Sequence, residues 1–175
     1  NLNTGDWVYN TAGYVDETYG AGRILVRLPG LYNSTVFQGL EPNDINSCIF
    51  YCNRTSIKST ESVKLYLSNG AWTESTATWS NFGNGSNYYS GTAWSTVAFN
   101  GTALSFNISA LVRAWKRGTY SASNGFVLIN DNETGASYKC GVYSSEHSNT
   151  EKRPYFVMNY DADIVLDKAE LEVKL

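Results

Sequence analysis

The chain has little charge and no long apolar run, and each shortage excludes a class of protein. Only 17% of its 175 residues are charged, and 13 Lys and Arg against 16 Asp and Glu give a formal net charge of -3. Binding to nucleic acid requires a dense basic face, which this balance does not supply. No apolar run approaches the roughly 20 residues of a membrane-spanning helix. The sequence therefore predicts neither a nucleic-acid partner nor a membrane span.

Histidine and cysteine are also scarce. The single histidine, His147, lies in a polar segment and the chain has no nucleophile motif, so a Ser-His-Asp hydrolase is not expected. The three cysteines lack the CxxC spacing typical of zinc sites. Cys48 and Cys52 lie too far apart along one strand to bridge each other, whereas either can meet Cys140 across a sheet. Three buried free thiols are the simpler interpretation, and the oxidation state stays open.

What the chain does contain is typical of an extracellular β-protein. Aromatic residues make up 14% of the chain and include 13 Tyr. Segments rich in Asn, Ser, Thr and Gly separate the apolar runs. Short strands are expected at regular intervals, at 22–28, 45–53, 62–68, 103–108, 125–129, 137–144 and 155–160. This pattern predicts an all-β, antiparallel, jelly-roll-like β-sandwich with one short α-helix near residues 109–117.

The segment around the predicted helix changes its period from helical to extended. Residues 109–117 repeat apolar side chains at helical spacing, with Ser109 as the expected N-cap and Gly118 as the stop. Two turns of helix are unstable alone, so the apolar stripe with Trp115 is expected to pack in the core. The apolar run 125–129 follows as a buried strand.

Two domain segments are expected. Residues 1–160 form the sandwich, whereas residues 161–175 are the only charge-dense stretch in the chain. That tail is either a last edge strand of the same domain or a linker into a following domain.

Several motifs together resemble the bacterial DNRLRE domain family. They are WTESTATW at 72–79, NISALVRAWKRGTYSASNGFVL at 107–128, and YSSE at 143–146 followed by KRPYFVMNY at 152–160. The resemblance implies a jelly-roll-like module joined to neighbouring domains of a large secreted or cell-surface protein. Such modules accompany polysaccharide lyases and glycosidases, and some related modules bind alginate.

Polysaccharide binding requires exposed aromatic and hydrogen-bonding side chains. Arg23 and Arg27 are expected on one face of the strand at 22–28, as a basic strip about 14 Å long that suits an acidic polymer. The loop residues Tyr88, Tyr89 and Trp94 are expected to supply stacking surface. The alternative is that both arginines pair with neighbouring acids.

Other polar residues have structural interpretations at least as strong as functional ones. Trp72 and Glu74 fit sugar stacking and hydroxyl binding, but equally a loop anchored on the sandwich. Glu146 and Arg153 are expected to form an ion pair that closes the last two strands.

One turn has oxygen-rich side chains that suit calcium. Asp131 and Glu133 lie in the turn at 130–135 and are candidate ligands for a structural calcium ion. The spacing is not that of an EF-hand, and a hairpin turn held by Asn and Asp side chains explains the same residues. No other cofactor is expected.

The sequence thus predicts a monomeric, non-catalytic carbohydrate-binding module of a secreted or cell-surface bacterial protein. Its partner would be a polysaccharide, with an acidic polymer suited to the arginines. The alternative is a structural spacer or adhesin module of a large surface protein with no glycan ligand.

Overall fold

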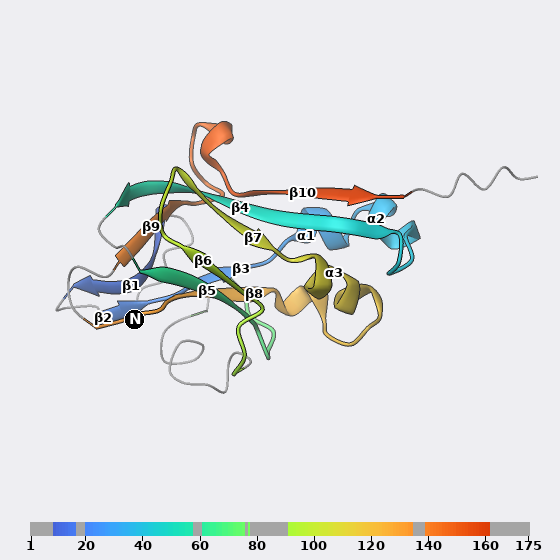
Figure 1. Cartoon of the computed structure of the whole chain (residues 1–175), viewed down its shortest axis with the longest axis horizontal. Coiled ribbons are helices and arrows are strands. Elements are labelled where there is room, and N and C mark those ends of the chain that lie inside the picture. Colours follow the sequence, from blue (N-terminus) through green and yellow to red (C-terminus); the bar gives the residue numbers. More distant parts are fainter. Residues whose placement is uncertain are drawn as a thin grey trace, which may run out of the picture.

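The structure is a computed structural model that describes residues 9–16, 20–57, 61–75, 77, 91–134 and 139–161. Two antiparallel sheets pack face to face, as Figure 1 shows in side view. The six-stranded sheet has the order β10-β4-β9-β1-β2, and β7 also pairs with β4. The four-stranded sheet has the order β3-β8-β5-β6. The predicted all-β sandwich is therefore confirmed.

The elements have the following bounds. The six-stranded sheet contains β1 (Tyr9–Asp16), β2 (Gly20–Gly22), β4 (Ile45–Ile57), β7 (Ala103–Asn107), β9 (Lys139–Tyr143) and β10 (Tyr155–Tyr160). The four-stranded sheet contains β3 (Ile24–Val26), β5 (Ser62–Leu67), β6 (Ser95–Ala98) and β8 (Phe126–Asn130). The helices are α1 (Pro29–Tyr32), α2 (Thr35–Gly39) and α3 (Ser109–Lys116), with 3-10 turns η3 (Ala122–Asn124) and η4 (Thr150–Lys152). Among the described residues, no helix is long and apolar enough to cross a membrane.

The core forms where the alternating apolar residues of the two sheets meet. β5 buries every second side chain, and Phe50 of β4 packs edge-on against Phe126 of β8 with ring centroids 5.1 Å apart. β8 is buried on both faces. Val127 and Ile129, which face away from the core, form a second apolar cluster with Leu25 and other side chains. The expected buried run at 125–129 thus belongs to a strand covered on both sides.

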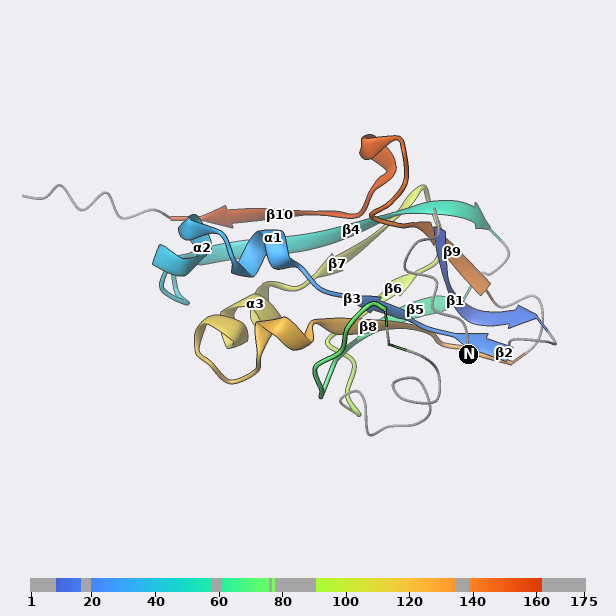
Figure 2. The same cartoon turned by 180° about the vertical axis from the view of Figure 1, so that it is seen from behind.

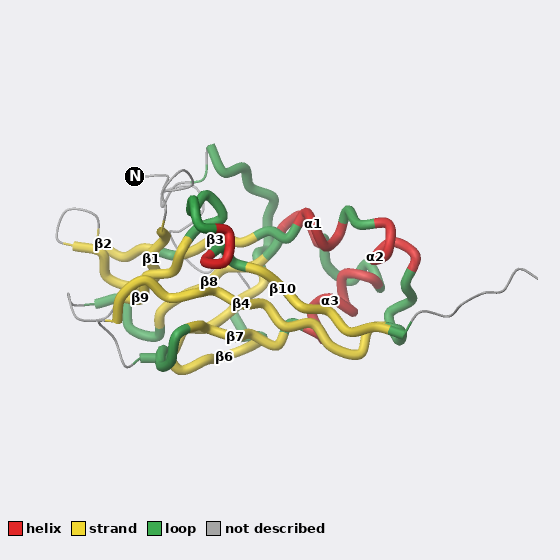
Figure 3. The backbone as a smooth tube through the Cα atoms, turned by 90° about the horizontal axis from the view of Figure 1, so that it is seen from above, coloured by secondary structure: helices red, strands yellow, loops and turns green. Residues whose placement is uncertain are grey.

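α3 closes one end of the sandwich as predicted, and Figure 3 shows all three α-helices at that end. Its apolar stripe is buried, including Trp115 at 6% exposure. Gly118 ends the helix with φ of 70°, where the left-handed conformation favours glycine. The expected N-cap is wrong: the N-cap residue is Ile108, whose side chain makes no capping hydrogen bond, and Asn107 Oδ1 accepts the Ser109 N–H at 3.0 Å.

Two one-turn helices, α1 and α2, form between β3 and β4, where the sequence pattern predicts no helix. Ser34 caps α2, since its Oγ accepts the Phe37 N–H at 3.1 Å. Phe37 and Leu40 are buried in the core, whereas Val36, which the sequence groups with them in one apolar patch, is 47% exposed. Helices this short are held by tertiary packing, which a sequence pattern does not reveal.

All three cysteines are buried free thiols in this structure. Burial raises the pKa of Cys48 to about 12, and it raises that of Cys52 well above the ordinary value, with a smaller contribution from neighbouring Cys140. The interpretation of these residues as small core side chains is confirmed.

Candidate functional site

A groove of about 530 Å³ opens on the side of the sandwich where the edge strands of the two sheets face each other. Figure 2 shows this side, with β10 in the upper layer and β3 in the lower. Phe50 and Cys52 of β4 lie at the floor. The remaining lining residues are Ile24, Leu25, Val26, Arg27, Leu28, Pro29, Gly30, Trp72, Glu74, Val142, Tyr143, Ser144, Ser145, Pro154, Tyr155 and Phe156.

One rim of the groove is an arginine stacked on a tryptophan. The Arg27 guanidinium carbon lies 4.5 Å from the centre of the Trp72 ring, within the range of a cation–π interaction. The Trp72 indole N–H donates to the Asn124 carbonyl at 2.9 Å, which fixes the ring against the η3 turn. No carboxylate forms an ion pair with Arg27 among the described residues. Its guanidinium donors therefore remain available to a ligand.

The opposite rim carries tyrosine and serine. Tyr155 is 46% exposed and stacks on Tyr51 of β4 at 4.8 Å between ring centroids, on the outer face of the sheet at the edge of the groove. Tyr143 contacts the His147 ring edge-on at 4.6 Å, and Ser145 is exposed beside it. The groove thus combines ring surface, hydroxyl groups and one cation, which is the chemistry needed to bind a hydroxylated ligand.

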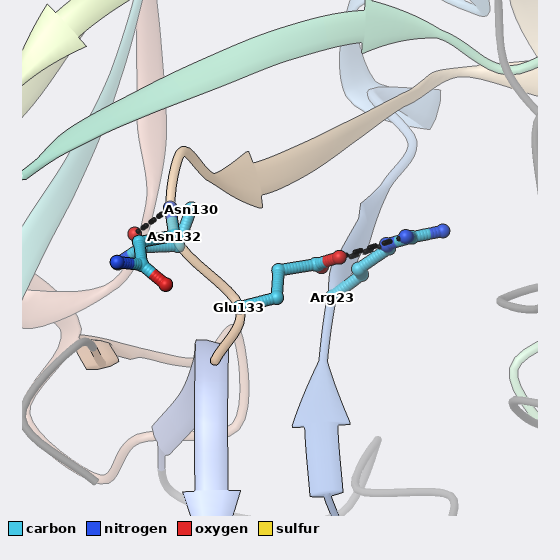
Figure 4. Close-up of polar contacts among 4 residues, drawn as sticks. All are labelled: Arg23, Asn130, Asn132 and Glu133. Carbon is cyan, nitrogen blue, oxygen red and sulfur yellow. Dashed lines mark hydrogen bonds and ion pairs between the residues drawn. The ribbon is translucent and has the colours of Figure 1, made fainter. Parts of the chain in front are cut away.

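Arg23 does not share this environment. Its Nε and Nη2 atoms each contact one carboxylate oxygen of Glu133 at 2.9 Å, a bidentate pair drawn in Figure 4. The two side chains are 12% and 23% exposed. The two arginines therefore do not form the expected basic strip. Arg23 pairs with an acid, as the alternative interpretation predicted, and only Arg27 lines the groove.

The turn predicted to bind calcium is held by its own polar groups. Asn130 Oδ1 accepts the Asn132 N–H at 3.0 Å, and Asn132 Oδ1 accepts the Thr134 N–H at 2.9 Å. Asp131 pairs with Lys64, while Glu133 is bound to arginine. The described residues contain no group of three or more His, Cys, Asp or Glu suited to a metal ion. These contacts match the hairpin-turn interpretation.

The three aromatic residues predicted for sugar stacking do not form one surface in the described structure. Tyr88 and Tyr89 lie outside the described residues. Trp94 is half-buried against the core and packs edge-on against Tyr120 at 5.8 Å. Its ring is part of the packing rather than an open platform.

The expected ion pair between Glu146 and Arg153 is wrong. Arg153 Nε donates to the His147 carbonyl at 2.8 Å, and Glu146 accepts from the Ser145 hydroxyl at 3.0 Å. The loop is also fixed by His147 Nδ1, which accepts the Asn149 N–H at 3.0 Å. Backbone contacts, rather than the two charges, close this turn.

The sequence singles out Trp72 and Glu74 but not Tyr143 and Tyr155, which line the same groove. Tyr143 ends β9 and Tyr155 begins β10, 12 positions later, with a loop between the two strands. Nothing in the local sequence pattern distinguishes these two residues from core tyrosines. The pairing of β10 with β4 and of β9 with β4 brings them to the groove that Arg27 also lines.

Comparison with known proteins does not assign a function to this groove. No model of a known protein family matches the chain, and no curated protein matches it.

Proposed function

We propose that this chain is a non-catalytic carbohydrate-binding module that holds a polysaccharide in the groove between β3 and β10. In this proposal Arg27, stacked on Trp72, binds a carboxylate or hydroxyl group of the sugar chain, and the exposed ring of Tyr155 lies at the edge of the groove. The motif resemblance to DNRLRE domains supports the same function and a place in a secreted or cell-surface bacterial protein.

The arrangement of Arg27 over Trp72 is the observation that carries the proposal. Stacking of the guanidinium on an indole keeps its planar edge free to donate two parallel hydrogen bonds. Arg23 and Arg153 have structural partners, since Arg23 is bound by Glu133 and Arg153 donates to the His147 carbonyl. An unpaired arginine at the rim of an apolar groove is instead placed to meet a ligand.

The lining residues also favour binding without chemistry. Glycoside hydrolysis uses two carboxyl groups separated by about 5 to 10 Å. Within the described groove, Glu74 is the only carboxylate. A single exposed acid accepts hydrogen bonds from sugar hydroxyls but lacks the partner that acid–base catalysis requires.

Binding to a glycan array followed by calorimetry tests this proposal. Arg27→Ala is expected to weaken binding at least tenfold, because hydrogen bonds to a charged group contribute about 1.5–3 kcal/mol. Arg117→Ala is the matched control, since Arg117 is exposed at the end of α3 and lies outside the groove. Trp94→Ala is not expected to remove the site.

Two results would count against the proposal. If Arg27→Ala and Arg117→Ala bind equally well, the ligand lies elsewhere. If the wild-type chain binds no acidic or neutral polysaccharide, the alternative of a structural spacer or adhesin module is favoured.

A further inference from the structure

Tyr155 belongs to two surfaces at once. It lines the groove, and its ring lies on the outer face of the six-stranded sheet, where it stacks on Tyr51 at 4.8 Å between ring centroids. Tyr51 is half-buried on the same outer face and does not line the groove. The stacked pair of rings therefore joins the groove to the surface above β10, β4 and β7.

This surface is formed by three neighbouring strands, in which residues that point outward alternate with residues that are buried or half-buried. Its two central rows, read across β10, β4 and β7, are Tyr155, Tyr51 and Ser105, then Val157, Ile49 and Asn107. We call these two rows the three-strand face. Because neighbouring strands lie about 4.8 Å apart, each row is about 10 Å wide.

The three-strand face is accessible, and its strands carry no charge. Tyr155 and Val157 are each 46% exposed, and Ser105 is exposed on β7. Figure 1 shows the loop that contains η4 above one end of β10 and no other described element above that strand. The strands β7 and β10, and the part of β4 that they flank, 45–53, contain no Asp, Glu, Lys or Arg. Ring surface beside neutral hydroxyl and amide groups suits the hydroxyl groups of a sugar chain.

Resting on the proposed function, we infer that a bound polysaccharide continues from the groove over Tyr155 onto the three-strand face, so that this module prefers long chains to short ones. The groove, with Arg27 at its rim, holds one part of the chain. The ring pair of Tyr155 and Tyr51 and the hydroxyl group of Ser105 contact the sugars that follow.

Chain length and salt concentration separate this arrangement from binding in the groove alone. Each aromatic contact or hydrogen bond gained on the face contributes a factor of about two to ten in affinity. Affinity should therefore rise by at least about tenfold from disaccharides to octasaccharides. This rise should be the same in low and in high salt, because screening acts on charges and the strands of the face carry none.

Calorimetry with two series of oligosaccharides, from disaccharides to octasaccharides, tests the inference. One series is oligogalacturonate and the other is cello-oligosaccharides, so that an acidic and a neutral chain are compared. Tyr51→Val removes a ring that lies on the face and outside the groove. It should weaken binding of octasaccharides about fivefold and leave binding of disaccharides unchanged. Tyr120→Val is the matched control, because Tyr120 is exposed and packs on Trp94 outside both surfaces.

Ser105→Val is a second variant, chosen because an exposed serine on a strand can be replaced by valine without disturbing the core. It removes one hydroxyl group from the far side of the face, and it should weaken binding of octasaccharides about threefold. Urea titration of each variant checks that it is folded. If Tyr51→Val does not fold, Ser105→Val decides the question.

Each outcome decides a different statement. Equal affinity of the wild-type chain for short and long members of the series that it binds overturns the inferred extension and leaves binding in the groove standing. The same holds if Tyr51→Val and Ser105→Val bind octasaccharides as well as Tyr120→Val does. A gain with length that disappears in high salt would mean that charged groups hold the longer chain, which also overturns the extension. Absence of binding to every polysaccharide on the glycan array refutes the proposed function itself.

Discussion

Replacing Gly125 by alanine is expected to destabilise the fold far more than the same change at Gly118. Gly125 joins η3 to β8 with φ of 66° and ψ of -145°, a region occupied almost only by glycine. A Cβ atom at this position would lie 1.9 Å from the Val26 carbonyl oxygen. Both the backbone conformation and the close approach to β3 therefore require glycine.

The magnitude follows from these two terms. Holding a non-glycine residue in a sparsely populated backbone region costs about 1–3 kcal/mol. Moving the backbone to relieve an overpacked contact costs about 1–3 kcal/mol more. We expect Gly125→Ala to lower the free energy of unfolding by about 2–6 kcal/mol, the sum of the two costs, which is a large part of the stability of a domain this size.

Gly118→Ala is the matched control, because Gly118 has φ of 70° but open space around its Cα. This variant should lose only the backbone term, about 1 kcal/mol. Urea unfolding followed by tryptophan fluorescence measures both variants. If the two alanine variants are destabilised equally, the contact with Val26 does not constrain the fold and the reasoning is refuted.

Three further predictions concern single interactions. Glu133→Gln removes the bidentate partner of Arg23 and should lower the free energy of unfolding by about 1 kcal/mol in low salt and by less in 1 M salt, as compared by urea titration. Asn107→Ala removes the oxygen that accepts the Ser109 N–H, and the free energy of unfolding is expected to fall by about 1 kcal/mol. A fall of less than about 0.3 kcal/mol would contradict a stabilising role for this hydrogen bond. The thiol of Cys48 ionises near its ordinary pKa of 9.0 when unfolded but at about 12 when folded, so its contribution to stability is complete below pH 9 and is lost as the pH rises from 9 to 12. Cys48→Ala should flatten the decline in that window by up to about 1.4 kcal/mol per pH unit, and an unchanged slope would argue against a buried thiol.

Local periodicity allowed most of the strands and the main helix to be predicted. Alternation in 62–68 matches β5, and the helical spacing around Trp115 matches α3, because burial of one face imposes a period on each element. β6 and the helices α1 and α2 were missed, since short segments held by their neighbours carry too little periodic pattern.

The candidate site was predictable only in part, because its residues come from strands that are distant in the sequence. The sequence by itself determined that this is an all-β protein with little charge, that its cysteines suit a core, and that Arg23 and Arg27 are both candidates to meet a ligand. The tertiary structure alone decided that Arg23 is neutralised by Glu133, 110 positions away, while Arg27 stacks on Trp72. Periodicity is a property of neighbouring residues, whereas pairing across and between sheets joins distant ones, and it is those pairings that form the groove.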